Sequence, residues 1–204
     1  MQKELAIRKL LDGNSRFAAN KCIHPNIDFE RRFGTLESQS PFALVITCFD
    51  SRVPPEIIFD QGIGDLLVLR IPGPVLNEDI IGSVEYAVTG LNISLILVMG
   101  HENCAAVKLA LNNTKTLIGV DKITKALREN IGITTTDINY TMDEASIKNV
   151  KTVCSQLNGE SEMVSSAIKQ KKLEIIGLYY HLETGITEII SDNNWSKPCA
   201  KTIS

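Results

Sequence analysis

The chain has 204 residues and a formal net charge of −3, with 21 Lys plus Arg against 24 Asp plus Glu. That length suits one domain with a substantial core. The small charge and the lack of a basic block argue against nucleic acid as a partner. No apolar run approaches the ~20 residues of a membrane helix, and the charged start Met1–Leu5 lacks a signal peptide's apolar stretch. We expect a single-domain cytoplasmic protein with no membrane partner.

The five cysteines are few for the length, and their number is odd. Their spacing is not that of a disulfide scaffold, so reduced thiols in a cytosolic compartment are expected.

The N-terminal part is predicted to be helical and then irregular. Apolar residues recur at helical spacing over residues 3–19. Residues 21–40 show no clear period, apart from a short helical turn near Glu30–Arg32. We therefore expect residues 1–40 to form an N-terminal helical arm that packs on its own domain or on a partner.

Residues 41–204 are predicted to form one α/β domain. Apolar strands are expected at 42–48, 66–70, 93–99 and 173–180, with helices at 54–59, 79–90 and 105–111. Strands that are apolar on both faces and alternate with helices indicate a parallel sheet covered on both sides. A turn at Glu183–Gly185 predicts a fifth, antiparallel edge strand at 186–190. The fold class is thus α/β, with a mainly parallel central sheet flanked by helices.

The remaining expectations are less regular. Asp79 is expected to cap the helix at 79–90. Further helices are expected at 120–130, 143–157 and 161–171, a loop at 134–136, and a polar, loosely held tail at 191–204.

Two strand ends carry soft metal ligands. Cys48 ends the first strand, while His101 and Cys104 lie on the turn after the third strand. In an open parallel sheet, reactive residues collect beyond the carboxyl ends of the strands. Two thiolates and one imidazole suit Zn²⁺, and three protein ligands leave the fourth position open for catalysis. Taken singly, each residue is more simply read as core packing or a structural hydrogen bond.

Asp50 and Arg52 lie next to this cluster and suggest how the metal is controlled. A zinc ion with two thiolates is formally neutral, so it should acidify a bound water less than a site of three neutral histidines. Asp50 can accept a hydrogen bond from that water, or it can bind zinc as a fourth ligand and close the site. Arg52 can hold Asp50 in a bidentate pair. A structural zinc is the alternative, with a fourth ligand from Asp50, Cys22, Cys154 or Cys199.

These residues lie in motifs that resemble the β-class carbonic anhydrases. The matching segments are CFDSRVPPE at 48–56, FDQG at 59–62, GDL at 64–66, GSVEYAV at 82–88 and GHENCAAV at 100–107. Gly13–Phe17 resembles a segment of bacterial members, and Gly177–Tyr180 with Thr184–Gly185 resembles the last strand and hairpin of the family. The resemblance spans nearly the whole chain.

The resemblance implies reversible hydration of CO₂ to bicarbonate and a proton. It implies that Cys48, His101 and Cys104 bind Zn²⁺, and that zinc-bound hydroxide attacks CO₂ while Asp50 and Arg52 control the fourth position. It also implies a homodimer in which the N-terminal helices embrace the neighbour, with pairing of dimers into tetramers.

Three positions depart from the family pattern. Pro72-Gly73-Pro74 replaces a small-Gly-Asn loop, Ala105 replaces a glycine, and Phe49 replaces a small residue. The altered loop motivates an alternative, a carbonyl sulfide or carbon disulfide hydrolase on the same scaffold. Together with Ala105 it also leaves open a catalytically impaired zinc-binding dimer.

Some members also carry an inhibitory bicarbonate site made by Trp, Arg and Tyr. Arg70 and Tyr180 match two of those positions, but Val45 stands at the third. No bicarbonate site of that form is therefore expected.

Overall fold

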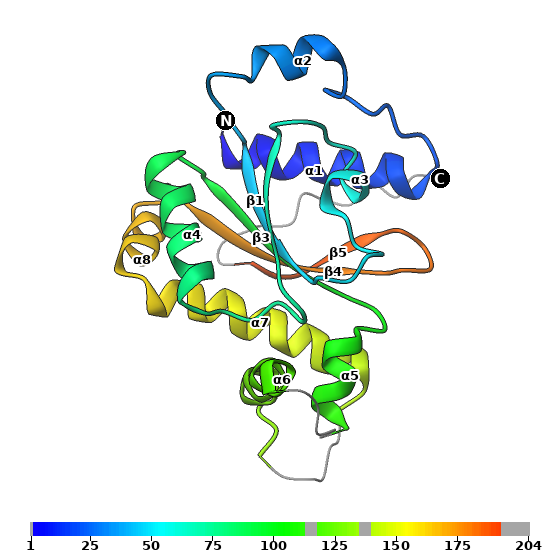
Figure 1. Cartoon of the computed structure of the whole chain (residues 1–204), viewed down its shortest axis with the longest axis vertical. Coiled ribbons are helices and arrows are strands. Elements are labelled where there is room, and N and C mark those ends of the chain that lie inside the picture. The colour runs from blue at the N-terminus through cyan, green and yellow to red at the C-terminus, as the bar shows by residue number, and fades with distance from the viewer. Residues whose placement is uncertain (1, 113–117, 135–139, 193–204) are drawn as a thin grey trace.

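The computed structural model describes residues 2–112, 118–134 and 140–192 (Figure 1). A single sheet has the strand order β2-β1-β3-β4-β5. The first four strands are parallel, and β5 pairs antiparallel with β4. This confirms the predicted mainly parallel sheet with an antiparallel edge strand. The strands are β1 Ala43–Thr47, β2 Leu66–Arg70, β3 Leu95–His101, β4 Glu174–Tyr180 and β5 Thr187–Asp192.

Helices cover both faces of this sheet. Alternate side chains of a strand point to opposite faces: Val45 enters a core that includes residues of α1, α3, α5 and α6, while Leu44 enters a core with α4, α7 and α8. The predicted α/β class with flanking helices is confirmed. The helices are α1 Lys3–Ala18, α2 Phe29–Gly34, α3 Pro55–Ile58, α4 Glu78–Gly90, α5 Ala105–Leu111, α6 Ile118–Ile131, α7 Met142–Glu160 and α8 Glu162–Lys169.

Several of the boundary predictions were wrong: the third strand, for example, runs to His101 and not to Met99, so His101 ends β3 and does not lie on the following turn. The N-cap of α4 is Asn77 and not Asp79: Asn77 has extended backbone and accepts a hydrogen bond from the Ile80 N–H at 2.9 Å. Asp79 instead lies in the first turn, where a carboxylate favours the positive end of the helix dipole. β5 continues to Asp192, beyond the predicted Ile190, because it keeps pairing with β4. Cys199, the tail from 193 and residues 135–136 lie outside the described residues.

No helix in the described ranges is both long and apolar enough to span a membrane.

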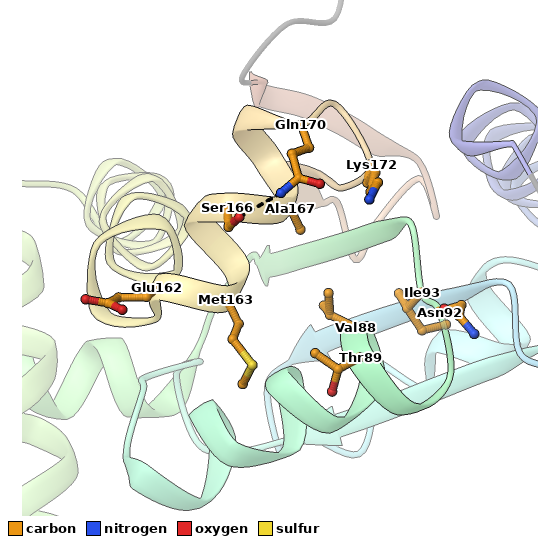
Figure 2. A pocket seen from close by; sticks show the side chains of 10 residues that line it. All are labelled: Val88, Thr89, Asn92, Ile93, Glu162, Met163, Ser166, Ala167, Gln170 and Lys172. Atoms are coloured by element: carbon orange, nitrogen blue, oxygen red, sulfur yellow. Dashed lines mark hydrogen bonds between the residues drawn. The ribbon is translucent and has the colours of Figure 1, made fainter.

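A surface pocket lies between the end of α4 and α8, beside Ile93 at the amino end of β3 (Figure 2). Its lining is mixed, with Met163 next to polar groups such as Thr89, and Gln170 donates to Ser166 at 2.9 Å.

The first helix is tied to the rest of the chain by buried hydrogen bonds. Asn14 of α1 is 4% exposed and donates to the carbonyls of Ile58 and Gly185, at 3.2 and 2.8 Å. Its carbonyl oxygen accepts from both the N–H and the hydroxyl of Thr187. One amide therefore joins α1, the end of α3 and the β4–β5 hairpin.

Replacing Asn14 with Ala should lower the free energy of unfolding by roughly 3 kcal/mol, because several buried backbone groups lose their partner at once. Urea denaturation measures the change. The matched control is Asn112→Ala, at the exposed end of α5, which should stay within about 0.5 kcal/mol. Equal effects of the two substitutions would contradict the role given to Asn14.

Candidate metal centre

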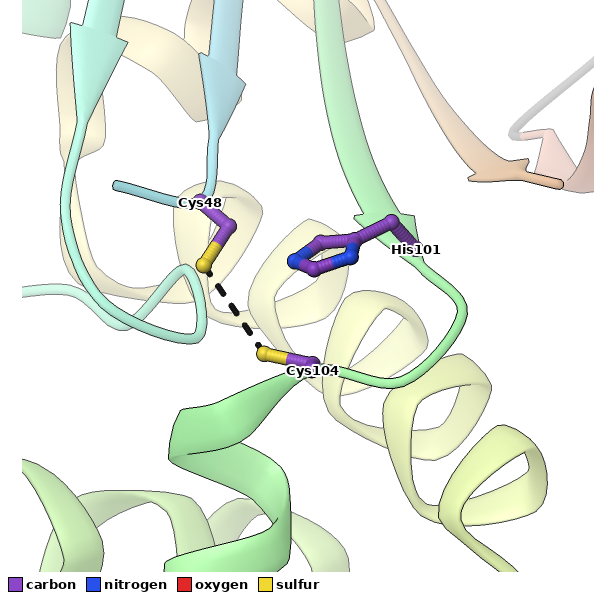
Figure 3. Close-up of side chains that lie close together, drawn as sticks. All are labelled: Cys48, His101 and Cys104. Atoms are coloured by element: carbon purple, nitrogen blue, oxygen red, sulfur yellow. Dashed lines mark hydrogen bonds between the residues drawn. The ribbon is translucent and has the colours of Figure 1, made fainter. Parts of the chain in front are cut away.

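The fold brings Cys48, His101 and Cys104 together at the carboxyl ends of β1 and β3 (Figure 3). Their ligand atoms all lie within 4.8 Å of one another, and all three side chains are buried. Cys48 follows β1, His101 is the last residue of β3, and Cys104 is the N-cap of α5. Because β1 and β3 are parallel neighbours, both strands deliver their ends to the same edge.

The geometry of this cluster fits a zinc ion. The Cys48 and Cys104 sulfurs are 3.8 Å apart, much longer than a disulfide bond. A tetrahedral Zn²⁺ with Zn–S bonds of ~2.3 Å places two sulfurs roughly 3.8 Å apart. His101 Nε2 is buried without a hydrogen-bond partner, which is costly unless a ligand satisfies it.

The tautomer of His101 agrees with metal binding. Its Nδ1 lies 2.7 Å from the carbonyl oxygen of Glu102. A carbonyl can only accept, so Nδ1 carries the proton and Nε2 presents its lone pair to the cluster. Fixing one ring nitrogen in this way is the usual means of orienting a metal-binding histidine.

The buried thiols of Cys48 and Cys104 shift each other's pKa in opposite directions. A hydrogen bond from the Cys104 thiol lowers the pKa of Cys48, while the bond to Cys48 and burial raise the pKa of Cys104. Metals bind cysteine as the thiolate, so two adjacent buried sulfurs can supply two ligands to one ion.

The turn from His101 to Cys104 depends on one unusual backbone conformation and on one close packing contact. Asn103 has φ 50°, a left-handed conformation that asparagine tolerates better than most residues. Gly100 lies against α7, where a Cβ would come within 2.8 Å of Ser146 Oγ and Val150 Cγ2. The glycine therefore lets α7 pack directly under the end of β3, where the Ser146 hydroxyl donates to the His101 carbonyl at 3.4 Å.

Asp50 and Arg52 form a bidentate pair next to the cluster. The guanidinium donates through Nε to Oδ1 at 2.9 Å and through a terminal nitrogen to Oδ2 at 2.7 Å. That terminal nitrogen also donates to the Asn103 carbonyl at 3.2 Å, so Arg52 links the two strand ends. The hydrogen bond from Arg52 lowers the pKa of Asp50 to about 2, and the carboxylate stays charged at neutral pH.

Candidates for a fourth protein ligand lie elsewhere. Within the described part of the chain, the carboxylate of Asp50 is not among the atoms grouped within 4.8 Å. Cys154 packs in the core on the other face of the sheet, with α4 and α8. Cys22 is half-buried, near Asp60 and Arg16. Cys199 lies outside the described residues. The structure thus groups three ligands, and it does not group a fourth with them.

Arg70 braces the first motif. It donates to the backbone carbonyls of Cys48, at 3.2 Å, and of Asp50. Tyr180 is 4% exposed in the core and Val45 is fully buried. The sequence predicted no bicarbonate site from these positions, and that stays a prediction.

The three departures from the family pattern have separate environments. Ala105 is exposed at the start of α5, so its methyl group does not point into the cluster. Phe49 is 69% exposed. Gly73 is buried, and its N–H donates to the sulfur of Cys48 at 3.3 Å. The altered loop is therefore in direct contact with a ligand of the cluster.

The sequence did not predict the role of Glu102. Its Oε1 lies 3.1 Å from His181 Nδ1, and Oε2 accepts from the N–H groups of Leu182 and Glu183 at 2.8 and 3.4 Å. The carboxylate thereby fastens the turn between His101 and Cys104 to the β4–β5 hairpin. The only sequence signal was an acidic residue between two ligands, and its partners lie about eighty positions later.

Comparison with known proteins identifies the family. Residues 43–187 match the family model described as carbonic anhydrase. The chain is 37% identical over 196 residues to a carbonic anhydrase of Mycolicibacterium smegmatis, covering 91% of this chain and 92% of that protein. It is 38% identical over 184 residues to carbonic anhydrase 2 of Mycobacterium tuberculosis, covering 88% and 89%.

A solved structure agrees. The β-carbonic anhydrase CcaA superposes with a TM-score of 0.68 at 26% identity, over 90% of this chain and 94% of that one. The matched segment contains both strand ends that carry the cluster. The resemblance read from the motifs is thus confirmed along the chain, which belongs to the β-class carbonic anhydrase family of enzymes.

Proposed function

We propose that the chain hydrates CO₂ reversibly to bicarbonate and a proton, using a Zn²⁺ held by Cys48, His101 and Cys104. The observation that carries the proposal is the buried cluster with an unpartnered imidazole nitrogen. Held by these three residues, a Zn²⁺ ion would supply Lewis acidity and a hydroxide nucleophile for CO₂.

Asp50 and Arg52 are proposed to keep the fourth position available. Arg52 occupies both carboxylate oxygens of Asp50, which biases that carboxylate away from metal coordination. The remaining lone pairs of Asp50 can accept a hydrogen bond from the attacking group and orient it toward CO₂. The hydrogen bond from Arg52 to the Asn103 carbonyl fixes this pair relative to the turn after β3.

CO₂ hydration should increase from neutral to alkaline pH. The increase should approach ~10-fold per pH unit below its midpoint, because one deprotonation creates the nucleophile. Asp50, with a pKa of about 2, stays ionised over the whole range and does not produce the slope. Stopped-flow assays from pH 6 to pH 9.5 measure the profile. A flat profile with full activity at pH 6 would contradict the proposal.

The alternative substrates are carbonyl sulfide and carbon disulfide. The observation that favours them is the Pro72-Gly73-Pro74 loop, which reaches the cluster through Gly73. Sulfide release from either compound by the zinc-loaded protein would support this reading, and its absence would eliminate it. The third reading is a non-catalytic zinc-binding dimer, which absence of CO₂ hydration by the zinc-loaded protein at both pH 7 and pH 9 would favour and hydration at either pH would exclude.

Self-association is also proposed, as a homodimer that can pair into a tetramer. The helix α2 buries none of its residues, and neighbouring apolar side chains are mostly exposed, which is unusual for a monomer. We propose that residues 1–40 act as an arm that covers this surface on a second copy. Light scattering should give at least twice the monomer mass of 22.5 kDa. The exposed apolar side chains on α2 and beside it, which form the surface proposed to be covered, are Ile23, Ile27, Phe29, Phe33 and Leu36.

A cytoplasmic location is proposed on the basis of the thiols. Cys22, Cys48 and Cys104 form no disulfide, as expected for a reducing compartment.

A further inference from the structure

The loop Pro72-Gly73-Pro74 has a single amide hydrogen. Proline has no backbone N–H, so Gly73 supplies the only donor of the three residues. That N–H lies 3.3 Å from the Cys48 sulfur and donates to it. The only backbone donor of the loop therefore contacts Cys48, a proposed metal ligand. A contact that fixes the position of the loop also fixes this hydrogen bond.

The same loop is held by a directional series of amides on α6 and α7. Asn149 Nδ2 donates to the Pro74 carbonyl at 2.9 Å. Asn149 Oδ1 accepts from Asn130 Nδ2 at 2.8 Å, and Asn130 Oδ1 accepts from Gln156 at 3.0 Å. Each amide donates to the next, and each orientation follows from its neighbour. Asn149 is 1% exposed, so solvent does not replace these bonds.

The loop is stiff enough to transmit this restraint. Both prolines have a locked φ, and Gly73 has φ +51°. A Cβ on Gly73 would meet Leu127 Cδ1 at 2.8 Å and Ala106 Cβ at 3.1 Å, so the glycine sits in a closely packed slot. With few free torsions between them, the Pro74 carbonyl and the Gly73 N–H move together.

We propose that Asn149 is a positioning residue that aims the Gly73 N–H at the Cys48 thiolate and so tunes the metal. A hydrogen bond to a ligating thiolate withdraws charge from the sulfur, which weakens its donation to the metal. The metal is then a stronger Lewis acid, which partly offsets the neutralising effect of two thiolates. This role rests on the proposed zinc site and gives the Pro-Gly-Pro loop a function within it.

The test uses the full chain loaded with Co²⁺ in place of Zn²⁺, with Asn149→Asp as the first variant. A carboxylate still accepts from Asn130 but cannot donate to the Pro74 carbonyl. The thiolate-to-cobalt charge-transfer band should move to longer wavelength, because a sulfur without its hydrogen bond gives up charge more easily. Release of Zn²⁺ to a chelator should become slower, because a sulfur without its hydrogen bond donates more strongly to the metal.

A second variant keeps the test decisive if Asn149→Asp folds poorly. In Asn130→Asp, the new carboxylate accepts from Gln156 but can no longer donate to Asn149 Oδ1. The Asn149 amide must then turn its nitrogen toward this carboxylate, and so away from the Pro74 carbonyl. The same band shift is expected from a residue further from the metal. The control is Thr152→Val, which removes the hydroxyl bond to the Asn130 carbonyl at 2.8 Å but leaves the series to Pro74 intact. Its band and its Zn²⁺ release rate should equal those of the unmodified chain.

The outcomes separate the two proposals. A shift in both aspartate variants and none in Thr152→Val supports the inference. A folded Asn130→Asp or Asn149→Asp protein with the unmodified band overturns it, as does an equal shift in Thr152→Val. Failure of the unmodified chain to show a thiolate-to-cobalt band would instead refute the zinc site itself.

Discussion

Cys104→Ser is expected to lose both its zinc and its CO₂ hydration. The substitution is nearly isosteric, but a serine hydroxyl is not ionised at neutral pH and is a poor zinc ligand. Two remaining ligands, Cys48 and His101, would leave the metal weakly held. We expect a loss of about 10³-fold or more in kcat/KM, which is a modest share of the ~10⁶-fold or greater acceleration typical of enzymes. Zinc content after gel filtration and stopped-flow hydration measure the two effects.

The matched control is Cys22→Ser. Cys22 is a half-buried free thiol near Asp60 and outside the metal cluster. This variant should keep one zinc ion per chain and full activity. Full zinc occupancy in Cys104→Ser would show that the three-residue cluster does not hold the metal.

Asp50→Asn should keep its zinc and lose most of its activity. The carboxylate is not grouped with the three ligands, so metal content should not change. An amide has one acceptor oxygen and no charge, and Arg52 loses its bidentate partner. We expect kcat/KM to fall by about 10²-fold or more, the scale of a positioned proton-handling group.

Arg52→Ala provides the complementary measurement. It removes the partner from Asp50 and frees the carboxylate to approach the metal. The double variant should be hardly worse than either single one, because the two side chains act as a unit. Asp79→Asn, an exposed carboxyl in the first turn of α4, is the control and should be fully active. If the losses in kcat/KM of the two single variants multiplied in the double variant, the two residues would act separately.

The sequence predicted the sheet and the metal cluster for the same physical reason. Residues 42–46, for example, are apolar at every position, which occurs where both faces of a strand are covered. A parallel sheet then places all its carboxyl ends on one edge. The sequence alone therefore predicts that Cys48 and His101 lie close together, although more than fifty residues separate them.

The groups that support the cluster could not be predicted, because their partners are set by tertiary packing. Asn149 lies 75 positions from Pro74 along the chain, and Glu102 lies 79 from His181. Neither pair follows from spacing or periodicity. The prediction of the N-cap of α4 was wrong although the two candidates are only two residues apart. Asn77 and Asp79 both suit an N-cap, and only the extended backbone at Asn77 distinguishes them.

The fastening of the His101–Cys104 turn bears on how the protein would respond to scarcity of its metal. Glu102, Arg52 and Ser146 hold the turn through the hairpin, the first strand end and α7. None of these bonds uses the three ligand atoms. Small zinc modules unfold without their ion because the ion supplies most of their stability, whereas this turn is also held by hydrogen bonds that do not involve an ion. Zinc supply would then set the active fraction of the molecules, while the number of folded molecules would stay the same.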